Sequence, residues 1–377
     1  MRKYFILKRT IPFILFIFIG VLVMYVCNIT SYNTVKAVTP SKAEAVIEVQ
    51  TGRVLFKNNA NVALPMASTT KVLTAIIIVE DCDLKQVLTV GKKSVGVEGS
   101  SVYLKENDRV TVEDLLYGLM LRSGNDCAET LALHHSGSIE KFAQVMTERA
   151  KTMGAINSNF KNPHGLPVHG HYTTAEDLAK ISAYAMRNSI FKKIVSTKQY
   201  LTSKQEGTDR RLFINKNKLL YNYSFADGVK TGFTKEAGRC LVSSATKNGM
   251  QIVAVVINSP NMYERSEELL ESAFAKYSMQ KVLDAKSLPQ ELPTEVKNKY
   301  CAIGEVNDIY YPVTSGEEKL IIRKISLPQF LKLPVHKGDV VGSFELYLQN
   351  EVILKGNIYA LQDVKKSYFD ILKDICH

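Results

Sequence analysis

The sequence predicts an α/β (α+β) domain with an antiparallel sheet flanked by helices, followed by a small all-β domain and a C-terminal amphipathic helix. Three observations lead to this prediction. Strand-like runs occur at both ends of residues 38–278, helical periods fill the middle, and short strands separated by Gly, Pro or Asn turns follow over 295–361. The chain has 377 residues, which suits two domains plus tails.

Composition and charge limit the class of protein before any motif is considered. With 46% hydrophobic and 23% charged residues, the chain has an ordinary globular composition. This excludes a disordered, collagen-like or polytopic membrane protein. The formal net charge of +11 indicates an anionic environment, such as nucleic acid, acidic lipid or a cell-wall polymer. Charge alone does not decide among these partners.

Residues 1–37 are predicted to be a signal peptide or an N-terminal membrane segment. Basic residues precede an almost uninterrupted apolar run from Ile11 to Cys27, and Val35 and Ala37 have the spacing that a signal peptidase accepts. We expect cleavage after Ala37 and an exported, extracytoplasmic protein associated with the membrane or wall of a bacterium. Export disfavours nucleic acid as a partner, so anionic lipid and wall polymers account better for the positive charge.

Residues 38–278 are predicted to begin and end with strands around a helical middle. Ala43–Val49 and Arg53–Phe56 form a hairpin, and the apolar run from Ser68 to Val79 predicts a helix buried on nearly all sides. Capping signals and breaks predict four more helices, over Val112–Leu121, Asp126–His135, Ile139–Met153 and 173–188. Strands return over Gly228–Phe233, Arg239–Thr246 and Met250–Asn258, before a last helix over Tyr263–Tyr277.

The remaining residues are predicted to form a linker, a β domain and a tail. Two Leu-Pro pairs interrupt the periodicity in the linker, 279–294. The β-rich domain over 295–361 has five predicted strands: Lys299–Ile303, Ile309–Val313, Leu320–Ser326, Val340–Leu348 and Glu351–Leu361. In the tail, 362–377, apolar side chains from Val364 to Ile375 fall on one face and lysines elsewhere, which is typical of an amphipathic helix.

The first chemical motif is the tetrad from Ser68 to Lys71, at the start of the buried helix. One helical turn separates the two residues, so the Lys71 amine can reach the Ser68 hydroxyl. A helix N-terminus favours an oxyanion, and a lysine can activate a serine only if its own pKa is lowered. Taken alone, the tetrad is common by chance and is better explained as an N-capping serine beside a solvated lysine.

Two more polar motifs follow on other predicted elements. Ser123–Asn125 lie in the break between two helices, and Lys230–Gly232 lie on a strand where glycine lets a substrate backbone approach. In isolation, the first reads as an ordinary helix–helix turn and the second as chance. In the order SxxK, SxN and KTG, each on its predicted element, the three motifs indicate one reaction class.

With these motifs the chain resembles the active-site serine penicillin-recognising enzymes, most closely the low-molecular-weight D-alanyl-D-alanine carboxypeptidases of bacteria. The likeness covers about residues 40–278 and includes the stretches PMASTTK (65–71), LLYGLMLRSGND (115–126), NPHGL (162–166) and DGVKTGFT (227–234). It implies a serine β-lactamase/transpeptidase-like fold here, then a second domain and an anchor at the outer face of the cytoplasmic membrane. The tail helix is shorter than in relatives.

The resemblance implies a role for each motif residue in removing the terminal D-alanine from a peptidoglycan stem peptide ending in D-Ala-D-Ala. Ser68 would attack the carbonyl, Lys71 would accept its proton, and Ser123 would relay a proton to the leaving amine. The residues expected to bind substrate are Asn125, Lys230, Thr231, Gly232, Phe233 and Arg265. Lys230 would also lower the pKa of Lys71 by like charge, and backbone N–H groups of Ser68 and Phe233 would form the oxyanion hole.

The same resemblance implies covalent inhibition by β-lactam antibiotics and no requirement for a metal or other cofactor. For Arg265, the expected role is to hold the substrate carboxylate, because a buried carboxylate calls for a guanidinium. The alternative is that Arg265 is a surface charge on the last helix. The residue pattern leaves both open.

Three other functions compete with the carboxypeptidase. A serine β-lactamase shares the motifs but usually needs a deacylating carboxylate in an ExxLN stretch between the second and third motifs, and none is present. A non-catalytic penicillin-binding or wall-binding module is disfavoured because the set of motif residues is complete. A zinc peptidase with His164, His169 and His171 as ligands is disfavoured because no acidic residue lies at helical spacing among them.

Overall fold

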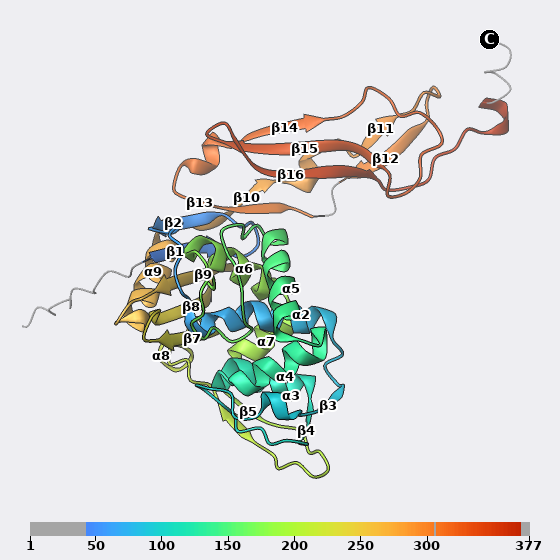
Figure 1. Cartoon of the computed structure of the whole chain (residues 1–377). Coiled ribbons are helices and arrows are strands. Elements are labelled where there is room, and N and C mark those ends of the chain that lie inside the picture. The colour runs from blue at the N-terminus through green and yellow to red at the C-terminus, as the bar shows by residue number, and fades with distance from the viewer. Residues whose placement is uncertain (1–42, 305–306, 371–377) are drawn as a thin grey trace, which may run out of the picture. The chain divides into compact units, whose positions relative to one another are not determined.

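The computed structural model describes residues 43–304 and 307–370. Its first domain is built on a five-stranded antiparallel sheet in the order β2-β1-β9-β8-β7 (Figure 1). The strands are β1 Ala43–Glu48, β2 Val54–Asn58, β7 Ala226–Thr234, β8 Gly238–Lys247 and β9 Met250–Ile257. The prediction that the first and last strands share one antiparallel sheet is confirmed, because β1 pairs with β9.

Helices cover both faces of this sheet. Those of the first domain are α2 Lys71–Asp81, α3 Val112–Tyr117, α4 Asn125–Ser136, α5 Ile139–Thr152, α6 Ala175–Arg187, α7 Ser189–Ser196, α8 Leu219–Asn222 and α9 Met262–Lys276. The predicted capping box is present, since the side chains of Thr111 and Asp114 each accept a backbone N–H of the other at the start of α3. Thr174, one residue later than expected, caps α6.

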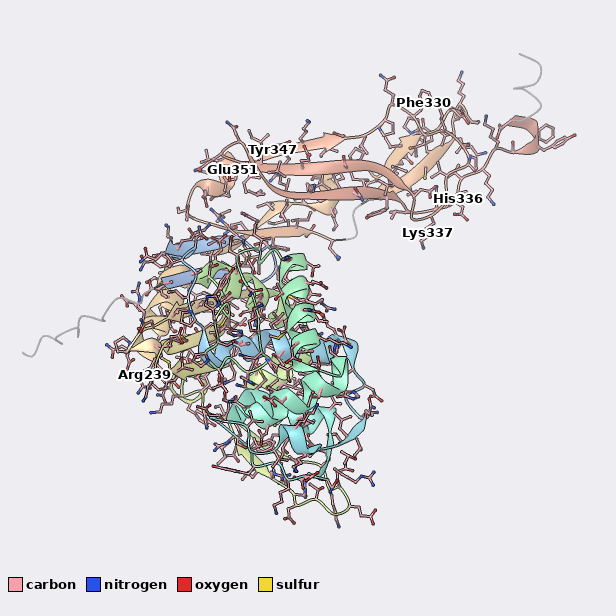
Figure 2. The ribbon with its side chains drawn as sticks, in the orientation of Figure 1. Arg239, Phe330, His336, Lys337, Tyr347 and Glu351 are labelled. Carbon is pink, nitrogen blue, oxygen red and sulfur yellow. The ribbon has the colours of Figure 1, made fainter. Side chains whose placement is uncertain are left out.

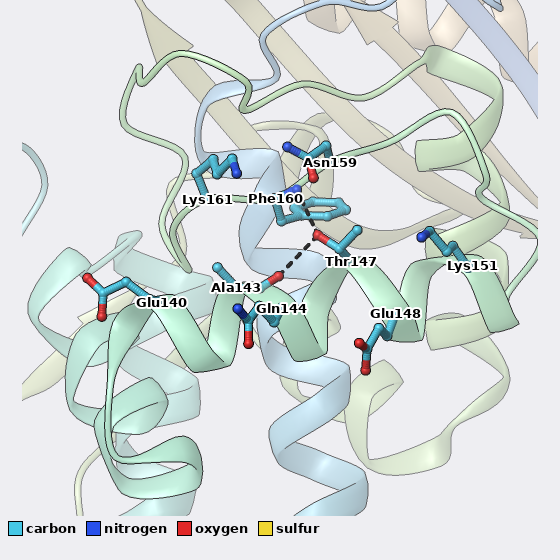
Figure 3. A pocket seen from close by; sticks show the side chains of 9 residues that line it. All are labelled: Glu140, Ala143, Gln144, Thr147, Glu148, Lys151, Asn159, Phe160 and Lys161. Carbon is cyan, nitrogen blue, oxygen red and sulfur yellow. Dashed lines mark hydrogen bonds between the residues drawn. The ribbon is translucent and has the colours of Figure 1, made fainter.

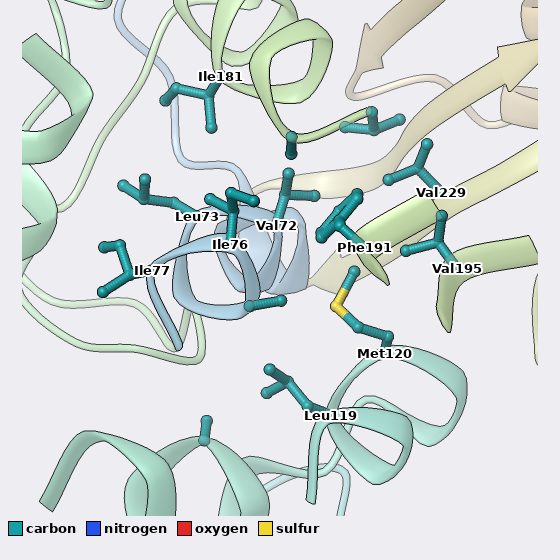
Figure 4. Packing of buried hydrophobic residues seen from close by; sticks show 14 of the residues in the cluster. Val72, Leu73, Ile76, Ile77, Leu119, Met120, Ile181, Phe191, Val195 and Val229 are labelled. Atoms are coloured by element: carbon teal, nitrogen blue, oxygen red, sulfur yellow. The ribbon is translucent and has the colours of Figure 1, made fainter. Parts of the chain in front are cut away.

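Helix α2 is buried on nearly all sides, as its apolar run predicts. Figure 4 shows its Val72, Leu73, Ile76 and Ile77 packed among side chains from α6, α7, β7 and the turn after α3. Every residue from Lys71 to Val79 is buried. The helix that carries the first motif is therefore held from several directions, which suits a rigid platform for a site.

Helix α9 covers the other face of the sheet. Val253 and Val255 of β9 belong to the core that contains α2, whereas Ala254 and Val256 pack with α9. Successive side chains of a strand point to opposite faces, so this alternation places α2 and α9 on opposite sides of β9. A side chain carried by α9 therefore starts from the face opposite to the first motif.

Several short elements escape sequence analysis. The paired strands β3 Val87–Thr89 with β4 Arg109–Thr111, and β5 Gln199–Leu201 with β6 Leu212–Ile214, have three residues each. Three residues are too few to show a strand period. The turns η1 Ala67–Thr70 and η3 Gly118–Arg122 are also irregular, since η1 is a 3₁₀ turn and η3 is a π-helical turn.

The second domain has its own hydrophobic core and contains two sheets. One has five strands in the order β11-β12-β16-β15-β14, and the other pairs β10 with β13. The strands are β10 Ser278–Leu283, β11 Glu291–Pro293, β12 Tyr300–Gly304, β13 Ile309–Val313, β14 Ile322–Ser326, β15 Val340–Leu348 and β16 Glu351–Ala360. The predicted linker over 279–294 is therefore wrong, because β10 and β11 occupy half of it and pair with later strands.

The tail begins differently from the prediction. Val364, expected on the helix, pairs with Val335 through backbone hydrogen bonds in both directions and is buried in the β core. Helical backbone starts at Tyr368, and the rest of the predicted amphipathic helix, from 371, lies outside the described residues. The predicted leader, 1–37, lies outside them too. Within the described part of the chain, no helix has both the length and the apolar character needed to cross a bilayer.

Candidate active site

Ser68 lies in the 3₁₀ turn η1, directly before α2 rather than within it. The turn is strained, because Ala67 has a left-handed backbone with φ of 50°, which is uncommon for a residue with a Cβ atom. Two hydroxyls stabilise the turn by donating to backbone carbonyls. Thr69 Oγ1 donates to Met66 O at 2.6 Å and Thr70 Oγ1 donates to Ala67 O at 2.8 Å.

The Lys71 amine contacts three oxygens. Its Nζ lies 3.0 Å from Ser68 Oγ, 2.7 Å from Asn125 Oδ1 and 2.8 Å from the carbonyl oxygen of His164. The last two oxygens are acceptors only, so a neutral amine donates its two hydrogens to them. Its lone pair is then directed at Ser68, whose hydroxyl can donate. This arrangement fits a base that removes the Ser68 proton.

Burial is the main reason that Lys71 can be neutral. The side chain is fully buried, and burial lowers the pKa of Lys71 well below its usual range, with the Lys230 ammonium as the next cause. The like-charge effect of Lys230 on the pKa of Lys71, expected from the sequence, is thus present but smaller than the effect of burial. Lys230 is itself buried, and burial, followed by the charge of Lys216, lowers the pKa of Lys230 to about 7.

The backbone around the second motif fixes the Asn125 amide. Asn125 Nδ2 donates to the carbonyl of Glu98, which leaves Oδ1 to face Lys71. Asn125 N also donates to Ser100 O at 2.7 Å. The buried Asp126 carboxylate accepts backbone N–H groups from Val102 and Leu104, and so holds the same loop. Sequence analysis missed this role of Asp126, although the residue ends the stretch LLYGLMLRSGND.

Ser123 owes its position to the π-helical turn. After Arg122 the backbone leaves η3, and Ser123 adopts a left-handed conformation with φ of 64° and is buried. π-turns and left-handed non-glycine residues are both enriched at functional sites because they re-aim a side chain. The predicted break between two helices is therefore a specific bend, two residues before the Asn125 amide.

The third motif lies at the edge of the sheet, because β7 is its last strand. A Cβ atom on Gly232 would come within 3.1 Å of Met66 O and of the backbone nitrogens of Ser68 and Thr69. Glycine is favoured here because a side chain would crowd the backbone of η1. The contact brings the KTG strand against the turn that carries Ser68. Phe233, the next residue, is exposed, and its ring lies 5.7 Å from the Arg239 guanidinium.

The structure does not bring Arg265 to this cluster, so the expectation that it holds a substrate carboxylate is corrected. Arg265 lies on α9, on the opposite face of the sheet from α2. Its Nε and Nη2 atoms donate to the two carboxylate oxygens of Glu44 at 2.7 and 2.9 Å, and Nη1 donates to Glu268 at 2.8 Å. Glu44 is fully buried, so Arg265 neutralises a buried charge.

Two other cations, Lys216 and Arg239, are better placed than Arg265 to hold a substrate carboxylate. Lys216 is close enough to lower the pKa values of both Lys71 and Lys230, and Arg239 lies opposite Phe233 across β7 and β8. Figure 2 labels Arg239, which projects from the sheet of the first domain. Neither residue belongs to a motif, so the sequence offered no signal for them. The His164 carbonyl was also missed, although NPHGL includes His164.

The three loop histidines do not converge. His164 Nε2 lies 3.4 Å from Glu129, and both ring nitrogens of His171 have partners within the protein. His169 lines a hollow that His171 also lines. Over residues 43–304 and 307–370, no group of three or more His, Cys, Asp or Glu side chains could hold a metal ion. Glu176, between the second and third motifs, pairs with Lys57 and Lys180 instead of facing Lys71.

Comparison with known proteins places the fold in one class. The crystal structure of penicillin-binding protein 5 from Haemophilus influenzae superposes with a TM-score of 0.70 at 28% identity, over 88% of this chain and all of that one. A variant of the Streptomyces K15 DD-transpeptidase superposes with a TM-score of 0.60 at 31% identity, over 63% of this chain and all of that one. The first domain therefore has the fold of the penicillin-recognising serine enzymes, as the resemblance implied.

Sequence comparison defines the family within that class. Residues 31–261 match the D-alanyl-D-alanine carboxypeptidase family, and residues 277–366 match the C-terminal domain of penicillin-binding protein 5. The D-alanyl-D-alanine carboxypeptidase DacF of Bacillus subtilis is 31% identical over 341 residues, 87% of each chain. DacA of Haemophilus influenzae is 30% identical over the same share of both chains. The chain belongs to the D-alanyl-D-alanine carboxypeptidase family, and the predicted enzyme class is confirmed.

Proposed function

We propose that Ser68 is the nucleophile of a carboxypeptidase that removes the terminal D-alanine from peptidoglycan stem peptides ending in D-Ala-D-Ala. The observation that carries the proposal is the position of Lys71 Nζ, whose two carbonyl acceptors leave its lone pair toward Ser68 Oγ at 3.0 Å. A buried, neutral lysine is the base that this serine needs. The family and its curated members support the substrate.

The reaction then follows from the groups in place. Lys71 takes the Ser68 proton as Oγ attacks the carbonyl of the penultimate D-alanine. Ser123 relays that proton to the leaving nitrogen, so that D-alanine departs as a neutral amine and the acyl group stays on Ser68. Water then hydrolyses the ester. Asn125, Thr231 and Gly232 would position the substrate along the open edge of β7, and N–H groups of Ser68 and Phe233 would bind the oxyanion.

Penicillin provides the direct test, because a β-lactam should acylate the same hydroxyl. Wild-type protein is expected to form a covalent adduct that mass spectrometry of a digest places on the peptide with Ser68, and Ser68→Ala should form none. Thr69→Ser is a matched control, since it keeps both Ser68 and the hydroxyl that donates to Met66 O, and it should still be labelled. An adduct on another peptide would refute the assignment of Ser68.

A second assay separates this function from that of a β-lactamase. The protein should release D-alanine from a pentapeptide ending in D-Ala-D-Ala, yet should recover from penicillin over minutes or longer, because the sequence has no ExxLN stretch between the second and third motifs to supply a deacylating carboxylate. Fast, repeated hydrolysis of penicillin without D-alanine release would favour a β-lactamase over a carboxypeptidase.

The charge on Lys230 should appear in the pH dependence of acylation. Lys71 acts only when neutral, so acylation falls as the pH drops below the pKa of Lys71. Removing a neighbouring positive charge raises that pKa, so Lys230→Gln should move the acidic limb upward in pH while Lys230→Arg leaves it in place. The Gln variant should also lose about 1 to 3 kcal/mol of transition-state stabilisation. If both variants acylate more slowly but keep the wild-type acidic limb of the pH profile, Lys230 acts only in substrate binding.

We propose further that the protein acts outside the cytoplasm, at the outer face of the cytoplasmic membrane. The basic, apolar N-terminus, the net charge of +11 and the wall-directed activity of the family support this location. N-terminal sequencing of the exported protein should find Val38 as the first residue. An intact Met1 in the membrane fraction would favour a single N-terminal span instead.

A further inference from the structure

His171 is buried in a loop that is fixed at both ends. Asn159 and Tyr172 exchange backbone hydrogen bonds with each other, as do Leu64 and Thr173. His171 directly precedes Tyr172 in the chain and has 6% of its surface exposed, and its ring meets the Phe160 ring edge-on at 5.8 Å. The reaction described above does not use this side chain, and none of its contacts is to a reacting atom.

Both ring nitrogens of His171 have assigned roles. The backbone N–H of Lys161 donates to Nδ1 at 3.0 Å, so Nδ1 is an acceptor. Nε2 lies 3.0 Å from Thr70 Oγ1, whose own hydrogen goes to Ala67 O. Nε2 must therefore carry the hydrogen and donate it to Thr70. The neutral form with hydrogen on Nε2 satisfies every partner, and burial lowers the pKa of His171 to about 4, which keeps it neutral.

The segment that presents its N–H to His171 is anchored in turn. Figure 3 shows Thr147 of α5 between Ala143 and Phe160. Thr147 Oγ1 donates to Ala143 O at 3.1 Å and accepts the N–H of Phe160 at 3.0 Å. The residue after Phe160 is Lys161, whose N–H faces His171. Two hydrogen bonds, joined by the backbone between Phe160 and Lys161, thus connect α5 to the His171 ring.

The other end of the path is the strained turn before Ser68. Ala67 has left-handed φ, and its carbonyl oxygen accepts the Thr70 hydroxyl that His171 holds. Without the donor on Nε2, the buried Thr70 hydroxyl would lose a partner and its direction toward Ala67 O would be free. Conformations of this kind persist only where the surroundings determine them.

We propose that His171 is a positioning residue that, through Thr70, holds Ala67 in its left-handed conformation and so sets the direction of Ser68. The inference rests on the proposed role of Ser68 and deepens it. It differs from a general packing role because it requires a donor toward Thr70 and an acceptor toward Lys161. Glutamine offers both through its amide, whereas alanine offers neither.

The test measures acylation by penicillin, with the acylation rate constant and the dissociation constant determined separately. His171→Ala is expected to lower the acylation rate constant about 10-fold with little change in the dissociation constant, since the buried hydrogen bond that directs Thr70 is lost. His171→Gln should recover to within about 3-fold of wild type. Thr70→Val removes the intermediate hydroxyl, and adding His171→Ala to it should cost nothing further.

Thermal unfolding of each variant checks that the fold is intact. If His171→Ala does not fold, His171→Asn replaces it, because the shorter amide cannot reach Thr70. Wild-type rates in the Ala or Asn variant, no recovery by Gln, or the same loss in the Thr70→Val background would overturn the inference. If wild-type protein forms no adduct at Ser68, the proposed function fails first, and this inference falls with it.

Discussion

Lys71→Met is expected to slow acylation by penicillin about 100- to 10,000-fold, the usual contribution of a positioned general base. Methionine matches the length of the aliphatic stem, so the packing around α2 should survive. It has no lone pair of suitable basicity to take the Ser68 proton. The measurement is the second-order rate constant for labelling by a fluorescent penicillin, with Ser68→Ala as the control that should not be labelled.

The same variant should change how stability depends on pH. In the unfolded chain Lys71 has its ordinary pKa, about 10.4, whereas in the folded protein burial lowers it. Between these two values the unfolded chain binds more protons, so this residue makes wild-type stability rise with pH. Lys71→Met removes that contribution. Urea unfolding at pH 7 and pH 9.5 should show a smaller gain in the variant, and an equal gain would mean that Lys71 is charged when folded.

Arg265→Ala is expected to destabilise the protein by about 3 to 5 kcal/mol, because it leaves the Glu44 carboxylate buried without its guanidinium. Acylation by penicillin, measured well below the melting temperature, should stay near the wild-type rate. The free energy of unfolding from urea titration gives the first quantity. This pairing of a large stability loss with unchanged chemistry follows from the position of α9 across the sheet.

The double variant Glu44→Leu with Arg265→Leu provides the control. Replacing both charges with apolar groups removes the buried carboxylate along with its guanidinium, so the double variant should be less destabilised than Arg265→Ala. A drop in acylation with little loss of stability in Arg265→Ala would contradict the structure and return Arg265 to the substrate site.

Much of the fold was predictable because its signals are local. The apolar run of α2, the Thr111 capping box and the Asn248-Gly249 turn between β8 and β9 each specify one element. The π-helical turn before Ser123 was not predictable, because one extra residue in a turn leaves the apolar period almost unchanged. The linker was misplaced because the Leu-Pro pairs mark an interruption and do not show that β10 and β11 pair with later strands.

In the candidate site, too, the residues with a local signal in the sequence were predicted and the others were not. Ser68, Lys71 and Asn125 were found because their residue types carry the chemistry, and the fold brings them within hydrogen-bond distance. Arg265 was misassigned because the sequence of α9 does not reveal which face of the sheet it covers. The His164 carbonyl was missed because any residue has one, so a backbone ligand leaves no signature in residue type.

That backbone ligand shapes how this part of the sequence can drift over evolution. Since position 164 contributes its carbonyl oxygen to Lys71, many side chains there would leave that contact unchanged. The constraint passes to Gly165, which has φ of 91° and where an added Cβ atom would lie 1.9 Å from Ala67 O. The contact with Lys71 therefore constrains the path of the backbone at this loop more than the residue type at 164, and we expect a side chain at 165 to be excluded.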